Sequence, residues 1–258
     1  MSTEIPKPAS QSLPTLLPNL QYNDDLFNFT RGRFVIDEAF EMSQRHVQFN
    51  VNELARLAAE AVGANICVSI EKYPDGMYNK AMLLTMDNGT QVVAKVPNPN
   101  AGKPHFTTAS EVATMDFVRN ILKTPVPRVF AWSSKAQENS VGAEYIIMEK
   151  LPGIELELAW PTMKTEDRLA VIQTIATYQK SWTSISFEKY GGLYYAKDLD
   201  TSSYNEVLYT DADGVAVKDS RFAIGPSTGR ELIDNRRATV EFDRGPCIFP
   251  SPNLHLLD

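Results

Sequence analysis

The spacing of hydrophobic residues changes along the chain, and each change predicts a different element. Residues 51–62 carry apolar side chains three and four positions apart and are followed by Gly63, which indicates a short amphipathic helix. Apolar and polar residues then alternate, as they do in half-buried strands, over residues 66–73, 78–86 and 91–96. Asp87-Asn88-Gly89 predicts a tight turn, because asparagine and glycine adopt positive φ at little cost. We therefore expect a three-stranded antiparallel meander after the helix.

A helix and two further strands are expected to follow the meander. Thr108 and Glu111 have the spacing of a capping box, which predicts a helix from this point to about Leu122. Residues 129–132 and 145–148 are apolar and predict a fourth and a fifth strand. These elements together predict an α+β arrangement of five antiparallel strands crossed by one helix.

The second part of the chain has a weaker pattern. A long helix is expected over about residues 165–185, with an apolar face made of Leu169, Ile172, Ala176 and Trp182. Beyond Tyr190 no period persists, and residues 197–220 are polar. We expect this part to be mainly helical, with solvated loops.

Composition and charge narrow the class of protein. The chain has 25 Lys and Arg against 32 Asp and Glu, and a net charge of −7 argues against a broad surface for nucleic-acid phosphates. Its cysteines, Cys67 and Cys247, do not suggest a disulfide framework, and with the histidines they lack the spacing of zinc ligands. No run of 18 apolar residues is present, so no membrane span is expected.

One pair of charged residues fits a specific chemistry. The predicted order of strands, turns and helix is typical of the small lobe of a protein-kinase-like fold, in which a cation on the third strand contacts nucleotide phosphates and a carboxylate on the next helix holds it. Lys95 and Glu111 occupy these two positions. Each also has a simpler interpretation, because a strand lysine is usually solvated and Glu111 could serve only to cap its helix.

Two other segments complete the candidate cofactor-binding site. Gly76, Met77 and Tyr78 lie in the turn between the first two strands, where nucleotide phosphates would be covered. Met148 and Glu149 end the fifth strand, where an adenine ring would exchange hydrogen bonds with the backbone. A glycine in a hairpin turn often serves backbone geometry alone, so the ordered set carries more weight than any single residue.

Segments spread over most of the chain carry a resemblance to a known family. They are Phe29–Phe34, Gly76–Lys80, Val93–Pro97, Thr108–Met115, Tyr145–Glu149, Tyr190–Tyr195 and Gly225–Arg230. Through them the stretch from Phe27 to Val240 resembles the fungal Altered inheritance of mitochondria protein 9 group, which is aminoglycoside-phosphotransferase-like. The resemblance implies ATP-dependent phosphoryl transfer with ATP and Mg²⁺ as cofactors, a mitochondrial location, and contact of Lys95 with the α- and β-phosphates while Glu111 holds it.

The residues that transfer the phosphoryl group in such proteins are not found in this chain. Phosphotransferases of this group place a catalytic Asp two residues after a His, and an Asn and a second Asp for metal follow. No histidine of the chain is followed in this way, whether His46, His105 or His255. Asp200 and Asn205 have the required Asp-to-Asn spacing, with Asp213-Gly214 beyond them, but their polar surroundings predict a solvated loop. We therefore expect no catalytic and no metal-binding residues, and a chain truncated before the catalytic loop.

The expected organisation follows from these points. The fold class is α+β, protein-kinase-like, with four regions: a flexible leader (1–26), an N-terminal extension with a short helix (27–62), the small lobe (63–150) and an incomplete large lobe with polar loops (151–258). The expected partner is a nucleotide, whereas the acceptor substrate and the oligomeric state stay open. The alternative is a non-enzymatic binding or scaffold protein that uses the small lobe as a platform, through the 197–220 loop or Tyr194-Tyr195. Residues 1–22 have four prolines, one lysine and no arginine, which makes a cytoplasmic location the alternative to mitochondria.

Overall fold

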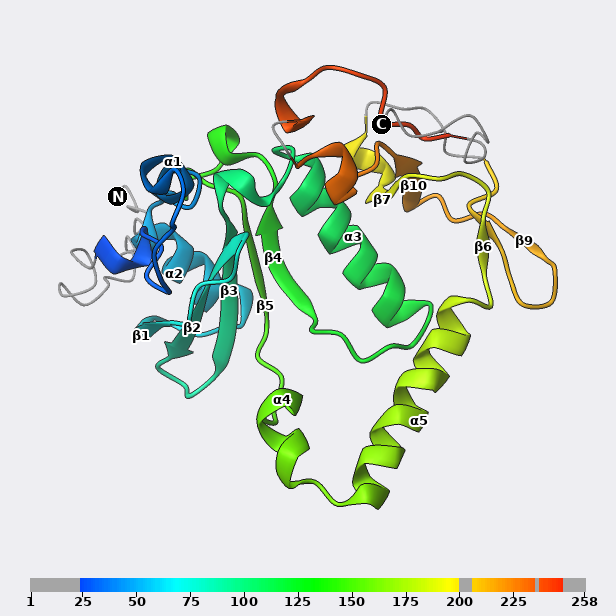
Figure 1. The fold of residues 1–258 in the computed structure, drawn as a ribbon, viewed down its shortest axis with the longest axis horizontal. Coiled ribbons are helices and arrows are strands. Elements are labelled where there is room, and N and C mark those ends of the chain that lie inside the picture. The colour runs from blue at the N-terminus through cyan, green and yellow to red at the C-terminus, as the bar shows by residue number, and fades with distance from the viewer. Residues whose placement is uncertain (1–23, 200–205, 235–236, 248–258) are drawn as a thin grey trace, which may run out of the picture.

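The computed structural model describes residues 24–199, 206–234 and 237–247 (Figure 1). Its α-helices are α1 (Glu38–Ser43), α2 (Val51–Ala61), α3 (Phe106–Asn120), α4 (Leu156–Ala159) and α5 (Thr165–Trp182). The strands of the main sheet are β1 (Cys67–Lys72), β2 (Asn79–Met86), β3 (Gln91–Pro97), β4 (Val129–Ser133) and β5 (Tyr145–Glu149). Shorter strands follow: β6 (Ser186–Phe187), β7 (Gly192–Tyr195), β8 (Tyr209–Thr210), β9 (Ala216–Val217) and β10 (Phe222–Gly225).

The main sheet has five antiparallel strands in the order β1-β2-β3-β5-β4. This confirms the predicted α+β class and the five-stranded antiparallel sheet. Side chains of β3 alternate strictly, because successive residues of a strand point to opposite faces: Val92, Ala94 and Val96 are buried, whereas Val93 and Lys95 are half-buried. The sheet therefore has one closed face and one partly open face.

Helix α2 closes the first of these faces. Asn50 begins the helix, and its side chain accepts a hydrogen bond from the Glu53 amide at 3.2 Å. The buried side of α2 then packs on the alternate residues of the strands, in a core that includes Leu54, Ala55, Ala58, Met82, Leu84, Val92, Val96 and Ile147. Since this face is filled, a ligand has room only on the opposite face, where Lys95 lies.

Helix α3 begins earlier than predicted. It starts at Phe106, with His105 at the N-cap and no side-chain capping bond, so the predicted capping box is wrong. The helix begins two residues ahead of Thr108, which is buried within its first turn. Glu111 consequently lies in the second turn, and its carboxylate accepts from Lys95 instead of capping the helix.

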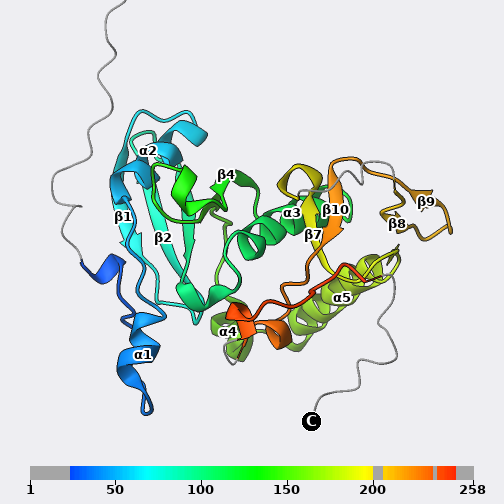
Figure 2. The ribbon, with the colours of Figure 1, turned by 90° about the horizontal axis from the view of Figure 1, so that it is seen from above.

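The short strands pack against the side of α3 that faces away from the main sheet (Figure 2). Strands β7 and β10 pair with each other, and the ring of Phe117 from α3 lies 5.6 Å from each of the rings of Tyr209 and Phe222. The polar, loop-rich part expected beyond Tyr190 thus also contains short strands among its described residues, and the helices of the second part are α4 and α5. Tyr194 is fully buried, which also removes it as a platform for a partner.

Helices α4 and α5 project from the rest of the molecule (Figure 1). No residue of α5 is buried, and Leu169 and Ile172, from its predicted apolar face, are each 53% exposed. Hydrogen bonds fasten the C-terminal end of α5 to the loop after α3, from Ser181 Oγ to Leu122 O at 3.2 Å and from Trp182 Nε1 to Thr124 Oγ1 at 2.9 Å. Among the described residues, no helix combines the length and the apolar character that crossing a bilayer requires.

Candidate functional site

The site is built around an ion pair between β3 and α3. The Lys95 ammonium group donates a hydrogen bond to Glu111 Oε1. The side chains of Lys95 and Glu111 are 18% and 35% exposed, so the pair lies at a surface that solvent and ligands can reach. Strand alternation places Lys95 on the open face, and the second turn of α3 brings Glu111 over that face. The structure therefore brings together the two residues that the sequence singled out.

The open face beside Lys95 is apolar. In the strand register Ala81 and Ile146 lie directly opposite Lys95, and Leu83 and Met148 lie opposite Val93. Residues opposite each other in neighbouring strands share a face, so the half-buried Ala81, Leu83 and Met148 form an apolar floor next to the ammonium group, whereas Ile146 on the same face is buried. An apolar floor with one cation at its edge suits a ligand that has both a flat aromatic part and an anionic part.

Glu149 is held at the edge of the sheet. Its amide donates to Arg128 O at 2.8 Å, and its carboxylate accepts from the Arg128 amide at 3.0 Å. A guanidinium nitrogen of Arg119 lies 3.5 Å from the same carboxylate. Met148 and Glu149 therefore point to different partners. Met148 shares the Lys95 face, whereas the amide and the carboxylate of Glu149 bind Arg128, which precedes β4, and the carboxylate lies near Arg119 of α3.

The turn between β1 and β2 is held by the loop that follows β3. Asn98 N–H donates to Tyr78 O at 2.8 Å, and Asn100 Nδ2 donates to Met77 O at 3.2 Å. Gly76 N–H donates to Asn79 O at 3.3 Å within the turn. The Met77 side chain is 62% exposed. The tip of the predicted phosphate-covering turn is therefore accessible, although its backbone is fixed.

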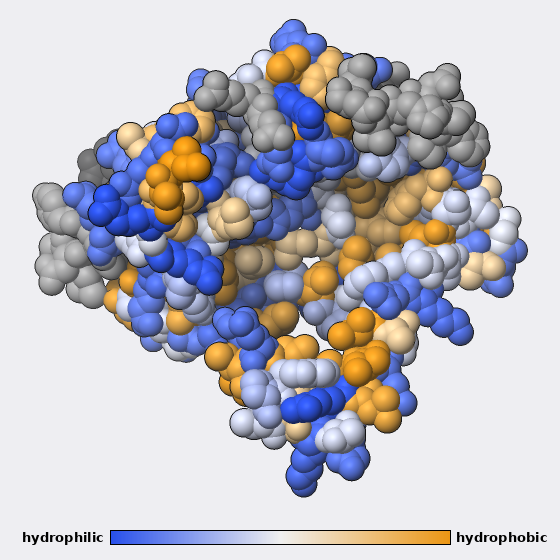
Figure 3. All heavy atoms as spheres, viewed as in Figure 1, coloured by the Kyte–Doolittle hydropathy of each residue, from blue (hydrophilic) through white to orange (hydrophobic). Residues whose placement is uncertain are grey.

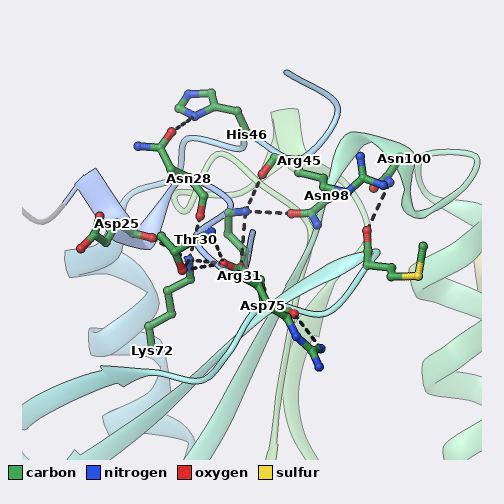
Figure 4. Close-up of polar contacts among 12 residues, drawn as sticks. Asp25, Asn28, Thr30, Arg31, Arg45, His46, Lys72, Asp75, Asn98 and Asn100 are labelled. Atoms are coloured by element: carbon green, nitrogen blue, oxygen red, sulfur yellow. Dashed lines mark hydrogen bonds and ion pairs between the residues drawn. The ribbon is translucent and has the colours of Figure 1, made fainter. Parts of the chain in front are cut away.

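The sequence pattern did not indicate a buried carboxylate that lies within this turn (Figure 4). Asp75 is 1% exposed and accepts hydrogen bonds from Thr30 N at 2.8 Å, Thr30 Oγ1 at 3.0 Å and Lys72 Nζ at 2.6 Å. Hydrogen bonds from these groups favour the charged carboxylate and keep the pKa of Asp75 below its ordinary value, against the burial that raises it. These hydrogen bonds tie Thr30 of the N-terminal extension to the β1–β2 turn.

Lys80 is the second buried member of this network. Its ammonium group donates to Arg45 O at 2.5 Å and to Asn98 Oδ1 at 3.0 Å, and it lies 3.9 Å from Asp75 Oδ1. Burial of the charge lowers the pKa of Lys80 to about 8, although the Asp75 carboxylate opposes the shift. One signal was present in the sequence, because Lys80 stands in the apolar row of β2 that continues through Met82, Leu84 and Met86.

The remaining sequence candidates lie only in part among the residues that the structure describes. Asp200, Asn205 and His255 lie outside the described residues. Asp213 is exposed in the turn between β8 and β9, and its amide donates to Asp211 Oδ1 at 3.0 Å. Within residues 24–199, 206–234 and 237–247, no three His, Cys, Asp or Glu side chains are grouped as metal ligands would be.

Comparison with known proteins identifies relatives among fungi. No protein-family model matches the chain. A subtelomeric hrmA-associated cluster protein of Aspergillus fumigatus is 42% identical over 181 residues, which cover 70% of this chain and 33% of that protein. Altered inheritance of mitochondria protein 9, mitochondrial, of Candida tropicalis is 31% identical over 199 residues, which cover 74% of this chain and 32% of the relative. This chain thus spans about a third of the length of these relatives.

Two further comparisons are more distant. Altered inheritance of mitochondria protein 9 of Clavispora lusitaniae is 25% identical over 252 residues, covering 83% of this chain and 41% of the relative. Among solved structures, a putative aminoglycoside phosphotransferase from Ralstonia eutropha matches 42% of this chain and 29% of its own, with a TM-score of 0.32 and 22% sequence identity.

Proposed function

We propose that this chain, which is a homologue of fungal Altered inheritance of mitochondria protein 9, binds a nucleotide through a protein-kinase-like small lobe. The observation that carries the proposal is the ion pair of Lys95 and Glu111 on the open face of the sheet. In protein-kinase-like folds a lysine of the third strand, held by a glutamate of the following helix, binds nucleotide phosphates. The strand order of the main sheet and the position of α3 after β3 support the same interpretation.

The surroundings of the pair suit a nucleotide. The floor beside Lys95, which includes Val93 and Met148, offers an apolar surface for a base, and Lys95 offers a charge for the phosphates. Figure 3 shows a hollow between the main sheet, α3 and α5, with hydrophobic residues on its walls. The exposed Met77 at the tip of the β1–β2 turn would then cover the phosphate end of the ligand.

ATP with Mg²⁺ is the cofactor we propose. The described residues form no cluster of metal ligands, so we assign Mg²⁺ no protein ligand and expect it to arrive on the phosphate oxygens of ATP. The role of this chain's own residues is to bind and orient: Glu111 fixes the Lys95 ammonium, and Lys95 neutralises phosphate charge. No aspartate of the chain is matched to the catalytic position, so we propose binding without phosphoryl transfer by this chain alone.

Ligand-dependent thermal stability tests the proposal. A ligand that binds only the native state stabilises it by about 2.7 kcal/mol at a hundred times its Kd. We expect a rise in Tm with Mg-ATP for the wild-type chain, a clearly smaller rise for Lys95→Met, and a rise equal to that of the wild type for Lys135→Met, which removes an exposed lysine paired with Glu138. Equal rises in all three proteins would contradict the site, and no rise in the wild type would contradict nucleotide binding.

Phosphate release from Mg-ATP tests the second part of the proposal. We expect release by the purified chain to equal that of the buffer. Release that depends on Lys95 would show that the chain hydrolyses ATP at this site and would contradict this part of the proposal.

A protein platform is the second candidate function. The observation that favours it is the exposure of apolar side chains around α4 and along α5. Ile154, just before α4, is 79% exposed, and Leu158 of α4 is 69% exposed. A wild-type chain whose Tm does not respond to Mg-ATP would favour this platform over the nucleotide site.

Mitochondria are the location that we propose. Relatives from several Candida species and from Debaryomyces hansenii are named as mitochondrial proteins. Fractionation of fungal cells that express the tagged chain is expected to place it with mitochondrial markers. Its recovery in the cytosolic fraction would contradict the assignment.

A further inference from the structure

The segment Gly225–Asp234, which begins at the last residue of β10, reaches back to the candidate site through one arginine. The Arg230 guanidinium lies over the ring of Tyr78, 4.0 Å from its centroid. Its NH1 group donates to Asn100 O at 3.3 Å and to Ala101 O at 3.0 Å, while its NH2 group pairs with Asp234. Arg230 thus contacts both the β1–β2 turn and the loop after β3, although 130 residues separate it from Asn100.

Asn100 connects the arginine to the tip of the turn. Its carbonyl accepts from Arg230, and its side-chain Nδ2 donates to Met77 O at 3.2 Å. Its own amide donates to Gln44 O at 3.2 Å, which ties the loop to the N-terminal extension. A guanidinium that fixes the carbonyl of Asn100 therefore also fixes the side-chain bond to Met77.

The strands next to this segment are packed on α3, the helix that carries Glu111. Tyr195 donates its hydroxyl hydrogen to Asp116 Oδ2 at 2.8 Å, and Tyr194 donates to Pro226 O at 2.6 Å. Gly192 makes this packing possible, because a Cβ at that position would lie 2.9 Å from Pro226 O and 3.1 Å from Ser110 Oγ. The same part of the chain is thus anchored on α3 at one end and on the β1–β2 turn at the other.

We infer that Gly225–Asp234 is a clamp that fixes the β1–β2 turn relative to α3, with Arg230 as its positioning residue. The clamp deepens the proposed function and rests on it, because its consequence for ligands is the affinity of the nucleotide site. The turn must be in place when phosphates bind beneath it. If loss of the clamp leaves the turn in place for only about a tenth of the time, the apparent affinity falls about tenfold.

The geometry favours positioning over direct contact with phosphate. Both terminal nitrogens of Arg230 already bind protein acceptors, namely the carbonyls of Asn100 and Ala101 and the carboxylate of Asp234. A lysine at this position would keep the charge but lose the planar group that stacks on Tyr78 while donating to two carbonyls. Arg230→Lys should consequently behave like Arg230→Ala.

Amide hydrogen exchange of the ligand-free, full-length chain tests the clamp without nucleotide. We expect Arg230→Ala and Arg230→Lys to exchange at least several times faster than the wild type in peptides covering residues 74–79 and 98–101. Arg221→Ala is the matched control, since Arg221 is 56% exposed and pairs with Asp219 on the same part of the chain. Asn100→Ala, which removes only the side-chain bond to Met77, is expected to speed amide exchange at residues 76–78. This variant tests the clamp if the Arg230 variants do not fold.

Titration with Mg-ATP of the same proteins separates the two hypotheses. We expect a Kd about five to ten times higher for Arg230→Ala than for the wild type and an unchanged Kd for Arg221→Ala. Faster exchange in Arg230→Ala together with no nucleotide binding by the wild type would support the clamp and contradict the proposed function. Unchanged amide exchange in the Arg230 and Asn100 variants would overturn the clamp. If Arg230→Ala nevertheless lowered the affinity for Mg-ATP, Arg230 would be a phosphate ligand instead.

Discussion

Lys80 and Lys95 stand on neighbouring strands, each near a carboxylate, yet their surroundings differ. The Lys80 side chain is 0% exposed on the face that α2 covers, and its ammonium donates to Arg45 O and Asn98 Oδ1. The Lys95 side chain is 18% exposed on the open face and pairs with Glu111. A strand lysine beside a carboxylate can thus belong to the structural framework or to a binding site, and the burial of its side chain distinguishes the two roles.

The physical cost of the two arrangements also differs. A buried charge loses its hydration and needs several partners to compensate, which the Asp75 network supplies to Lys72 and Lys80. Lys95 is partly hydrated, so its ammonium group can pair with an anionic ligand at a lower desolvation cost. Removal of Asp75 or Lys80 should therefore lower the stability of the fold, whereas removal of Lys95 or Glu111 should weaken nucleotide binding.

The largest effect is expected from Asp75→Ala. The substitution leaves two lysine ammonium groups near the turn without their carboxylate, and breaking a buried pair in this way costs about 3–5 kcal/mol of unfolding free energy. Glu138→Ala, which breaks the exposed pair with Lys135, should change the unfolding free energy by less than about 0.5 kcal/mol. Urea denaturation of the three proteins measures both values, and equal effects would contradict the distinction between buried and exposed pairs.

The pH dependence of stability tests the buried lysine itself. The pKa of Lys80, about 8 when folded, lies below the value of 10.5 for a free lysine. Between these values the unfolded chain binds more protons than the folded one, so the contribution of Lys80 to unfolding free energy rises with pH, by at most about 1.4 kcal/mol per unit. We expect the wild type to gain stability relative to Lys80→Met between pH 8 and pH 9.5. Parallel pH profiles would show that the Lys80 pKa is the same in both states.

Lys95→Met should have the opposite balance of effects. We expect nucleotide affinity to fall at least about tenfold, which corresponds to about 1.4 kcal/mol of binding free energy. The unfolding free energy should change by less than about 1 kcal/mol, because the pair with Glu111 is partly exposed. Isothermal titration and urea denaturation of the same preparation give both numbers. A large loss of stability with unchanged affinity would make Lys95 a framework residue like Lys80.

The smallest effect is expected on α5. Ile172 is 53% exposed, so Ile172→Ser should change the unfolding free energy by only about 0.5 kcal/mol. Leu84→Ala, at a fully buried position of β2, should cost about 2–5 kcal/mol. Similar costs for the two variants would show that α5 is covered in solution.

The features that sequence could predict are those set by local pattern. Alternation in β2 and β3 indicated the meander and put Lys95 on one face with Val93, and the position of Glu111 on the next helix followed from chain order. The role of Lys80 could not be predicted, because its partners come from Arg45 and Asn98, which only the fold brings together.

Two other predictions failed for similar reasons. The capping box was assigned from spacing alone, but α3 begins two residues earlier at Phe106, which leaves Glu111 free to pair with Lys95. The contact of Arg230 with Tyr78 joins segments that are distant in the chain, so no local period encodes it. Long-range polar contacts of this kind require the fold before they can be recognised.

Labelling with an acyl-phosphate derivative of ATP tests the central claim most directly. Such a reagent transfers its acyl group to a lysine amine next to the bound phosphates, and peptide mass spectrometry then identifies the lysine. We expect labelling of Lys95 that excess Mg-ATP prevents, and no ATP-sensitive labelling of Lys80. Labelling that ATP does not reduce, or that ATP reduces at Lys80 and not at Lys95, would contradict the assignment of Lys95 to a nucleotide site.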